Sequence, residues 1–219
     1  MRRLILLAIA ALSILTTRAV IAAVHGPTMS GADALKLLLE GNQRFIEGKL
    51  EHPNQSVARR DEVAKGQHPF AAVLACSDSR TSPEIIFDRG LGDLFVARVA
   101  GNVADQVVID SLDYSVKHLG VRLVTILGHN RCGAVTAAVE GHEEGGDVGP
   151  MLSELRPAVE AIKGMPGNPV ENAVRENVKL VMKKLATSGE LSAMAKSGEL
   201  KIVGGVYDLD TGKIEWLKD

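Results

Sequence analysis

Four short apolar runs stand out along the chain and predict buried parallel strands. They span residues 70–75, 94–99, 121–127 and 202–206. Apart from Arg98, Arg122 and Thr125, the runs are apolar at successive positions and lack the alternation of a half-exposed strand. We therefore expect both faces of each strand to be covered.

Helical periodicity fills much of the sequence between these runs. Apolar residues recur every three or four positions over 31–47, 105–119 and 170–186, which predicts three amphipathic helices. Ser30 precedes the first of them in a capping-box-like start, and Gly120 supplies a stop signal after the second.

The order of these elements predicts the fold class. Alternating strands and helices indicate an α/β fold with a mostly parallel central sheet of four strands and helices on both faces, preceded by the helix 31–47 as an N-terminal arm. The segment 207–216 resembles a hairpin that turns at Asp210 to Gly212, which adds an antiparallel edge strand.

The first 23 residues have the pattern of a secretory signal peptide. Two arginines follow Met1, an apolar run of about twelve residues comes next, and small residues end the segment, so cleavage is expected after Ala22 or Ala23. An uncleaved anchor is the alternative, although this run is shorter than the roughly 20 residues that span a bilayer. Residues 24–219 then form one catalytic domain that is periplasmic or secreted and has no membrane association after cleavage.

Charge and composition argue against nucleic-acid binding. The chain carries 25 Lys and Arg against 27 Asp and Glu, for a formal net charge of -2, and aromatic residues make up 3% of it. Such a chain has neither the basic field nor the stacking platform that nucleic acids require. We expect a small-molecule substrate.

The two cysteines of the chain are the strongest candidates for chemistry. Cys76 lies in Ala-Cys-Ser-Asp-Ser-Arg and Cys132 in Gly-His-Asn-Arg-Cys-Gly-Ala-Val, and each follows a predicted strand. Both thiols should therefore emerge at the carboxyl end of the sheet, and His129 should lie beside Cys132. Two thiols and an imidazole suit zinc. Two buried cysteines acting as small apolar residues, or a disulfide between them, are the alternatives.

These two segments resemble those of the β-class carbonic anhydrases, over roughly residues 30 to 210. In that family a Cys-x-Asp-x-Arg run and a His-x-x-Cys run supply the zinc ligands, and both are present here. The resemblance implies that Cys76, His129 and Cys132 bind one zinc ion in each subunit. It also implies that Asp78 and Arg80 form an ion-paired catalytic dyad beside the metal.

Three further positions match the substrate pocket of the plant-like subgroup of that family. They are Gln67, Phe95 and Tyr114. In the family this pocket is built across a subunit interface, so the resemblance implies a homodimer or a higher homo-oligomer. The chain departs from the family between Arg98 and Asn102, where Val99 replaces an asparagine that many relatives carry.

The implied reaction is the hydration of carbon dioxide to bicarbonate and a proton. Zinc lowers the pKa of a bound water, and Asp78, kept ionised by Arg80, accepts a hydrogen bond from that water and orients it. Asp78 is also near enough in sequence to close onto the metal in place of water. Two other functions stay open, which are hydrolysis of carbon disulfide or carbonyl sulfide on the same scaffold, and a zinc- or thiol-based redox sensor.

Overall fold

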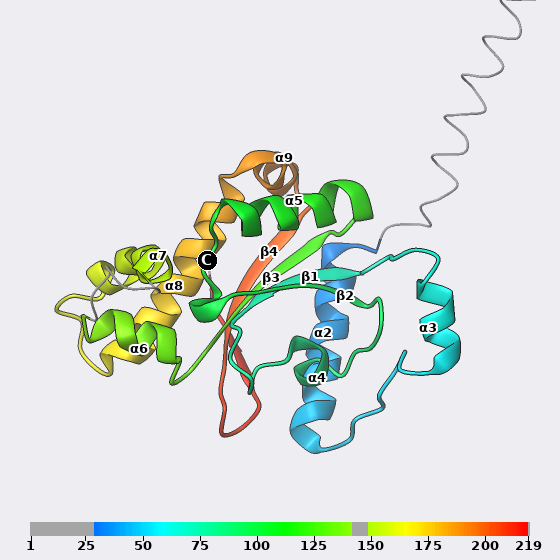
Figure 1. Ribbon diagram of the computed structural model, residues 1–219, viewed down its shortest axis with the longest axis horizontal. Helices are drawn as coiled ribbons and strands as arrows, with labels where there is room; N and C mark the ends of the chain where they lie inside the picture. The colour runs from blue at the N-terminus through cyan, green and yellow to red at the C-terminus, as the bar shows by residue number, and fades with distance from the viewer. Residues whose placement is uncertain (1–28, 142–148, 219) are drawn as a thin grey trace, which may run out of the picture.

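A computed structural model describes residues 29–141 and 149–218 (Figure 1). Its central sheet has five strands in the order β2-β1-β3-β4-β5. Neighbouring strands run parallel except for β5, which is antiparallel to β4. The strands are β1 (Ala71–Ala75), β2 (Leu94–Arg98), β3 (Leu123–His129), β4 (Lys201–Tyr207) and β5 (Ile214–Trp216). The predicted sheet and its antiparallel edge are confirmed, whereas the predicted signal peptide, 1–23, lies outside the described residues.

The three predicted helices are present with almost the expected limits, and shorter helices accompany them. The predicted ones are α2 (Gly31–Glu47), α5 (Gln106–Leu119) and α8 (Pro169–Ala186). The sequence patterns did not predict α3 (Val57–Val63), α4 (Pro83–Ile86), α6 (Gly133–Val139), α7 (Gly149–Ala161), α9 (Gly189–Ser197) or the 3-10 turn η1 (Ala100–Asn102). Several of these are too short for apolar periodicity to distinguish them from loops.

The predicted helix ends are formed by the side chains and backbone angles that the sequence suggested. The Ser30 hydroxyl oxygen accepts a hydrogen bond from the Asp33 N–H at 3.1 Å, which caps α2. Gly120 ends α5 with φ 75°, a left-handed angle that glycine adopts without a side-chain clash.

Helices cover both faces of the sheet (Figure 1). Ala71, Val73 and Ala75 of β1 belong to the apolar cluster that includes Leu38 of α2, whereas the intervening residues belong to the cluster that includes α5 and α8. Because strand side chains alternate between faces, Cys76 continues the set that points toward α5 and α8. Every residue of β1 and β3 is buried, which confirms the prediction for these two strands.

The edge strand β2 is an exception, and the expectation that it is covered on both faces is wrong for the single chain. All five of its residues are only half-buried. The physical reason is its position, since β2 ends the sheet and pairs only with β1 among the described strands. An apolar edge strand that stays half-exposed is a surface where a second chain can associate.

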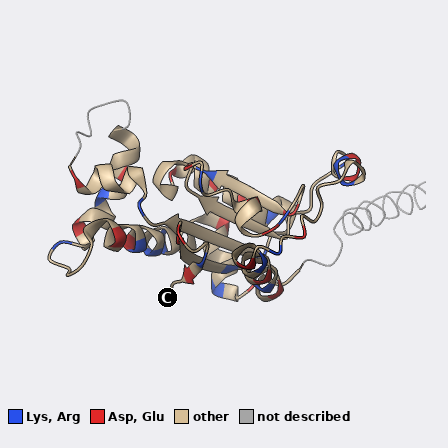
Figure 2. Ribbon diagram, turned by 90° about the horizontal axis from the view of Figure 1, so that it is seen from below, with Lys and Arg blue, Asp and Glu red and all other residues tan. Residues whose placement is uncertain are grey.

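Charged residues lie mainly on helices and loops, around strands that are largely free of them (Figure 2). Neither β1 nor β3 contains a charged residue. Within the described part of the chain, no helix has both the length and the apolar character needed to cross a bilayer.

Candidate metal centre

The loop after β1 holds Cys76 and Asp78 in a fixed conformation. Arg98, the last residue of β2, donates hydrogen bonds from Nε to the Cys76 carbonyl at 2.9 Å and from Nη2 to the Asp78 carbonyl at 2.6 Å. The Thr81 hydroxyl donates to the same Asp78 carbonyl at 3.0 Å. The backbone between the two residues is therefore held from both sides.

The turn from β3 into α6 supplies the other two side chains. His129 is the last residue of β3, and Cys132 is the residue that precedes α6. Arg131, between them, has a left-handed φ of 51°. The Asn130 N–H donates to the Tyr207 carbonyl of β4 at 3.1 Å, which fastens this turn to the neighbouring strand.

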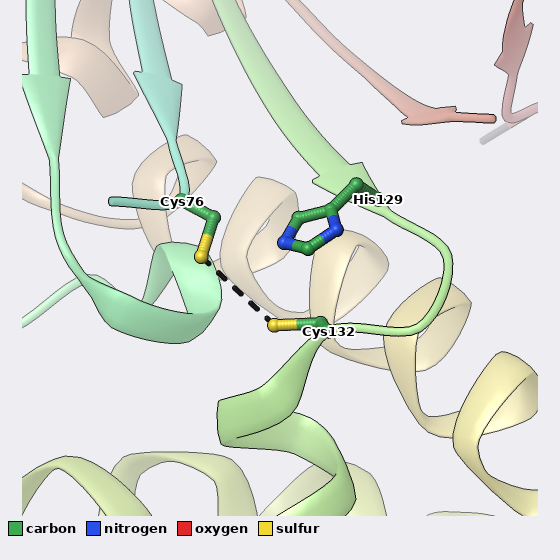
Figure 3. A group of neighbouring side chains, drawn as sticks. All are labelled: Cys76, His129 and Cys132. Atoms are coloured by element: carbon green, nitrogen blue, oxygen red, sulfur yellow. Dashed lines mark hydrogen bonds between the residues drawn. The ribbon is translucent and has the colours of Figure 1, made fainter. Parts of the chain in front are cut away.

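These two segments converge on one buried point (Figure 3). The two sulfurs lie 3.9 Å apart, and the ligand atoms of Cys76, His129 and Cys132 all lie within 4.8 Å of one another. The three residues are 4%, 1% and 1% exposed. Both cysteines are free thiols, because their separation is far longer than the roughly 2.05 Å of a disulfide.

The hydrogen bonding of His129 leaves one ring nitrogen available toward the sulfurs. Its Nδ1 lies 2.9 Å from the Asn130 carbonyl, which can only accept, so Nδ1 carries the proton. Its Nε2 is buried and has no hydrogen-bond partner among the described residues. A buried lone pair without a donor is costly, and a metal ion satisfies it.

The donor set fits zinc. Two sulfurs and one imidazole nitrogen are ligands that zinc prefers. With zinc–sulfur bonds of about 2.3 Å, two sulfurs at a tetrahedral angle lie about 3.8 Å apart. The observed separation of 3.9 Å agrees with that value. The residues present can therefore hold zinc without rearrangement of the two cysteines.

The two thiols have unequal acidities. A hydrogen bond from Cys132 lowers the pKa of Cys76 most strongly, and the N–H groups of Asp78 and Gly101 lower it further. The pKa of Cys132 is raised, because it donates to Cys76 and because it is buried. Cys76 is therefore the first of the pair to become a thiolate, which is the form that binds metals.

Asp78 and Arg80 form a bidentate ion pair at the edge of this centre. Arg80 Nε donates to Asp78 Oδ1 at 2.9 Å, and its Nη2 donates to Oδ2 at 2.7 Å. This pairing holds the pKa of Asp78 well below its usual range, so the carboxylate is ionised at neutral pH. Asp78 Oδ2 also lies 3.8 Å from His129 Nε2, so the carboxylate lies beside this ligand atom.

Comparison with known proteins identifies the family. A family model described as carbonic anhydrase matches residues 71–214. Carbonic anhydrase 2 of Mycobacterium tuberculosis is 41% identical over 195 residues, covering 85% of this chain and 93% of the relative. The carbonic anhydrase of Mycolicibacterium smegmatis is 36% identical over 198 residues, covering 86% and 94%. The chain belongs to the β-class carbonic anhydrase family.

Solved β-carbonic anhydrases have the same fold as this chain. The β-carbonic anhydrase CcaA superimposes with a TM-score of 0.65 at 26% identity, covering 84% of this chain and 95% of that one. The Coccomyxa β-carbonic anhydrase in complex with acetazolamide gives 0.67 at 27% identity, covering 82% and 84%.

The predicted substrate-pocket residues of this carbonic anhydrase lie apart from its metal centre. Phe95 of β2 and Tyr114 of α5 are in contact, with ring centroids 6.3 Å apart. Phe95 pairs in register with Ala72, near the amino end of β1, and Gln67 is exposed in the segment before that strand. Cys76 follows the carboxyl end of β1. Their role in the pocket stays a prediction, and the single chain does not bring Gln67 to its own metal ligands.

Sequence reasoning missed residues that support the carbonic anhydrase centre without being ligands. Arg98 is a charged residue at the end of an otherwise apolar strand run, and that contrast was available as a signal. Asn130 was visible only as part of a motif, yet its side chain accepts from the Leu209 N–H at 3.0 Å and donates to Asp208 at 3.0 Å. Those partners lie far along the chain, so no local pattern predicts them.

Proposed function

We propose that the protein catalyses the reversible hydration of carbon dioxide to bicarbonate and a proton, with one zinc ion held by Cys76, His129 and Cys132. The observation that carries this proposal is the convergence of two thiols and an unpaired imidazole nitrogen within 4.8 Å, beside an ionised carboxylate. Membership of the carbonic anhydrase family supports the reaction.

The metal and the dyad have separate tasks in this mechanism. Zinc, when bound, makes a water molecule acidic enough to attack carbon dioxide as hydroxide near neutral pH. Asp78 Oδ2 lies 3.8 Å from the His129 ligand atom. From there it would accept a hydrogen bond from the attacking water, which directs an oxygen lone pair toward the substrate. Arg80 keeps that carboxylate ionised and fixes its plane through two parallel hydrogen bonds.

The exposure of the dyad suggests the direction in which the released proton leaves. The three ligand residues are almost completely buried, whereas the Asp78 side chain is 17% exposed and the Arg80 side chain 52%. A proton released at the buried centre therefore meets solvent first on the side of the dyad. Buffer molecules take it up there.

We further propose that the working enzyme is a dimer whose substrate pocket takes residues from both chains. Val107 and Tyr114 lie seven residues apart on one face of α5 and are 71% and 46% exposed. Phe95 contacts Tyr114 from the half-buried edge strand β2. An apolar patch of this kind is suited to a second copy of the chain, whose Gln67, Phe95 and Tyr114 would face the neighbouring metal centre.

We also propose that the protein is exported from the cytoplasm and that it belongs to the plant-like subgroup of the family. The N-terminal pattern of residues 1–23 supports export to the periplasm or beyond, with removal of the leader. The positions of Gln67, Phe95 and Tyr114 in the sequence support the plant-like subgroup. Cell fractionation and N-terminal sequencing of the mature protein test the proposed export and removal of the leader.

The alternative functions have less support. The named relatives are carbonic anhydrases, which favours carbon dioxide over carbon disulfide or carbonyl sulfide. A redox sensor needs only the two thiols, whereas Asp78 and Arg80 here form a complete ion pair directed at the same centre.

The substitution Asp78→Asn tests the proposed function. It keeps the shape of the side chain but removes the charge, so turnover of carbon dioxide should fall by about 100-fold or more. Zinc content should stay at one ion per chain. Stopped-flow hydration assays with a pH indicator, together with elemental analysis, measure both quantities.

A matched control is Asp61→Asn, which breaks the exposed pair of Asp61 and Arg60 and should leave both quantities unchanged. Loss of zinc from Asp78→Asn would show that the aspartate is chiefly a metal ligand. A wild-type protein with full zinc content and no hydration activity would refute the function itself.

A further inference from the structure

A buried amide on α8 makes a hydrogen bond next to the metal centre. Asn177 is 2% exposed and lies on the apolar face of the helix, between Val174 and Val181. Its Nδ2 donates to the carbonyl of Gly101 at 2.9 Å. Burial of an amide is unfavourable unless it is hydrogen-bonded, so an asparagine on this face calls for an explanation.

Gly101 in turn contacts a proposed metal ligand. Its N–H donates to Cys76 Sγ at 3.3 Å. The residue has a left-handed φ of 70°, and a Cβ there would lie 3.1 Å from Leu155 Cδ1, so a larger side chain is disfavoured. The turn is closed by the Asn102 N–H, which donates to the Val99 carbonyl at 3.0 Å.

The two hydrogen bonds of Gly101 are coupled through its backbone angles. Glycine has the widest conformational freedom of any residue, so its N–H direction is poorly fixed by local sterics. A hydrogen bond from Asn177 to the Gly101 carbonyl restricts these angles, because the carbonyl and the N–H are joined through a single Cα. The N–H is thereby held toward the sulfur of Cys76.

An N–H donor at a thiolate changes how that thiolate binds a metal. The hydrogen bond draws negative charge from the sulfur, so the sulfur donates less charge to the ion. Two thiolates donate more charge than two imidazoles would and should make the metal a weaker acid toward water. Hydrogen bonds to sulfur oppose that effect, and Cys76 accepts one from Gly101 and a second from the Asp78 N–H at 3.4 Å.

We propose that Asn177 is a positioning residue of the metal centre, which holds the Gly101 N–H against Cys76 Sγ and so tunes the sulfur as a zinc ligand. The inference rests on the proposed function only in taking Cys76 as a ligand. Asn177 touches neither metal nor substrate and acts through Gly101. The contact joins α8 to the loop after β2, 76 residues earlier in the chain.

The test compares Asn177→Ala with Asn177→Gln and with a packing control. Asn177→Ala removes the donor, and Asn177→Gln keeps an amide on a longer side chain. Val181→Ala shortens another buried side chain of α8, one turn further along, and loses apolar contacts without removing a polar group. Each variant is characterised as a full chain by thermal unfolding.

Three readouts separate positioning from a structural role. Zinc affinity is measured by competition with a chelator, the sulfur-to-metal absorption band is recorded for the cobalt(II)-substituted protein, and the pH midpoint of turnover is determined. In Asn177→Ala the backbone at Gly101 no longer holds Cys76 Sγ in its ligand position, so zinc binding should weaken about 10-fold. Loss of the hydrogen bond to the sulfur should also shift the cobalt band and raise the pH midpoint of turnover. Asn177→Gln should recover part of each change, and Val181→Ala should lower the melting temperature alone.

The proposal is overturned if Asn177→Ala matches the wild type in all three readouts, or if Val181→Ala alters them equally. Zinc affinity and the cobalt spectrum do not depend on turnover. A wild-type protein that failed to hydrate carbon dioxide would therefore refute the proposed function, while these two readouts would still decide the role of Asn177.

Discussion

The two ends of β1 differ in how complete they are within one chain. At the carboxyl end, Cys76 meets His129 and Cys132 in a buried cluster whose ligand atoms lie within 4.8 Å of one another. At the amino end, Gln67 is exposed and Phe95 is only half-buried against Tyr114. The five residues between these ends span about 16 Å, so Gln67 cannot reach the cluster of its own chain across the strand.

This difference separates metal binding from substrate binding. A single folded chain contains every proposed zinc ligand. It also contains Arg98, whose hydrogen bonds to the carbonyls of Cys76 and Asp78 hold the loop in place. The proposed pocket residues instead lie on a surface with exposed apolar side chains. We infer that zinc binding is a property of the single chain, whereas a complete pocket requires two chains.

The largest loss of activity is expected from a substitution in the metal centre, at the carboxyl end of β1. Cys132→Ser replaces a soft thiolate by a hydroxyl that binds zinc poorly, so zinc content should fall to near zero and turnover by more than about 1000-fold, well beyond the 10- to 100-fold typical of residues outside the ligand set. Elemental analysis and a hydration assay measure the two effects. Retention of one zinc ion per chain would show that Cys132 is not a ligand.

A charge on the apolar surface of α5 should dissociate the proposed dimer without loss of the proposed zinc ion. Val107→Glu adds a carboxylate to the exposed face of α5, and the dimer dissociation constant should rise about 10- to 100-fold. Activity per chain should then fall on dilution while zinc content is unchanged. Analytical ultracentrifugation over a concentration series measures the association.

The matched control for this substitution is Met165→Glu, at a residue that is also exposed, at 51%, in the loop between α7 and α8. It should leave association unchanged. If Val107→Glu associated as tightly as the wild type, the α5 surface would not be the interface.

The amino end can be tested by complementation between subunits. Gln67→Ala removes one hydrogen bond to substrate and should lower kcat/KM about 10-fold with zinc retained. A purified heterodimer of Gln67→Ala with Cys132→Ser contains one chain with an intact metal centre and one with an intact Gln67. If the pocket is shared, this heterodimer should show about half of the wild-type activity per dimer.

If Gln67 served the metal centre of its own chain, the same heterodimer would show only half the activity of the Gln67→Ala homodimer. Two affinity tags allow the heterodimer to be isolated. That result would show that the substrate pocket is not shared between two chains.

The smallest effect on activity is expected for a substitution at Asp88, which should change the stability of the fold and leave catalysis unchanged. Asp88 is buried and accepts hydrogen bonds from Arg44 Nε at 2.6 Å and from the N–H groups of Glu51 and His52. Burial opposes ionisation of Asp88, but these donors outweigh it and lower its pKa. Asp88→Asn should lower the free energy of unfolding by about 1 to 3 kcal/mol at pH 7, with zinc content and turnover unchanged.

The pH dependence of this effect follows from the direction of the pKa shift. Because the folded state lowers the pKa of Asp88, its contribution to stability is present above the ordinary pKa of about 4 and is lost as the pH falls further. The difference between variant and wild type should therefore shrink below that pH. Chemical denaturation at several pH values measures it, with Glu160→Gln in the exposed pair with Lys163 as the control.

The sequence predicted the elements with strong periodicity and the ligands with fixed local spacing. The apolar runs located β1 to β4, and the spacing of three positions from His129 to Cys132 was enough to place both side chains on one side of a turn. The half-exposure of β2 could not be predicted from its composition, because a short apolar run does not indicate whether its strand lies at the edge or at the centre of the sheet.

The hydrogen bonds that support the metal centre also could not be predicted from short sequence patterns, because their partners lie far apart along the chain. Asn177 lies at an apolar position of α8, and an amide there signals a buried hydrogen bond without identifying the partner. Gly101 is that partner only because α8 crosses the sheet beside the loop after β2. Long-range geometry of this kind is set by the packed fold and not by any short motif.

The separation of the two cysteines along the chain would give a bound metal ion a second role. They lie 56 residues apart in sequence, so an ion bound to both would act as a cross-link that closes a long loop. Such a cross-link favours the folded state in proportion to the logarithm of the free ion concentration once sites are mostly filled. The resistance of the protein to heat and proteolysis would then depend on zinc supply, and chelation would weaken the whole domain as well as its chemistry.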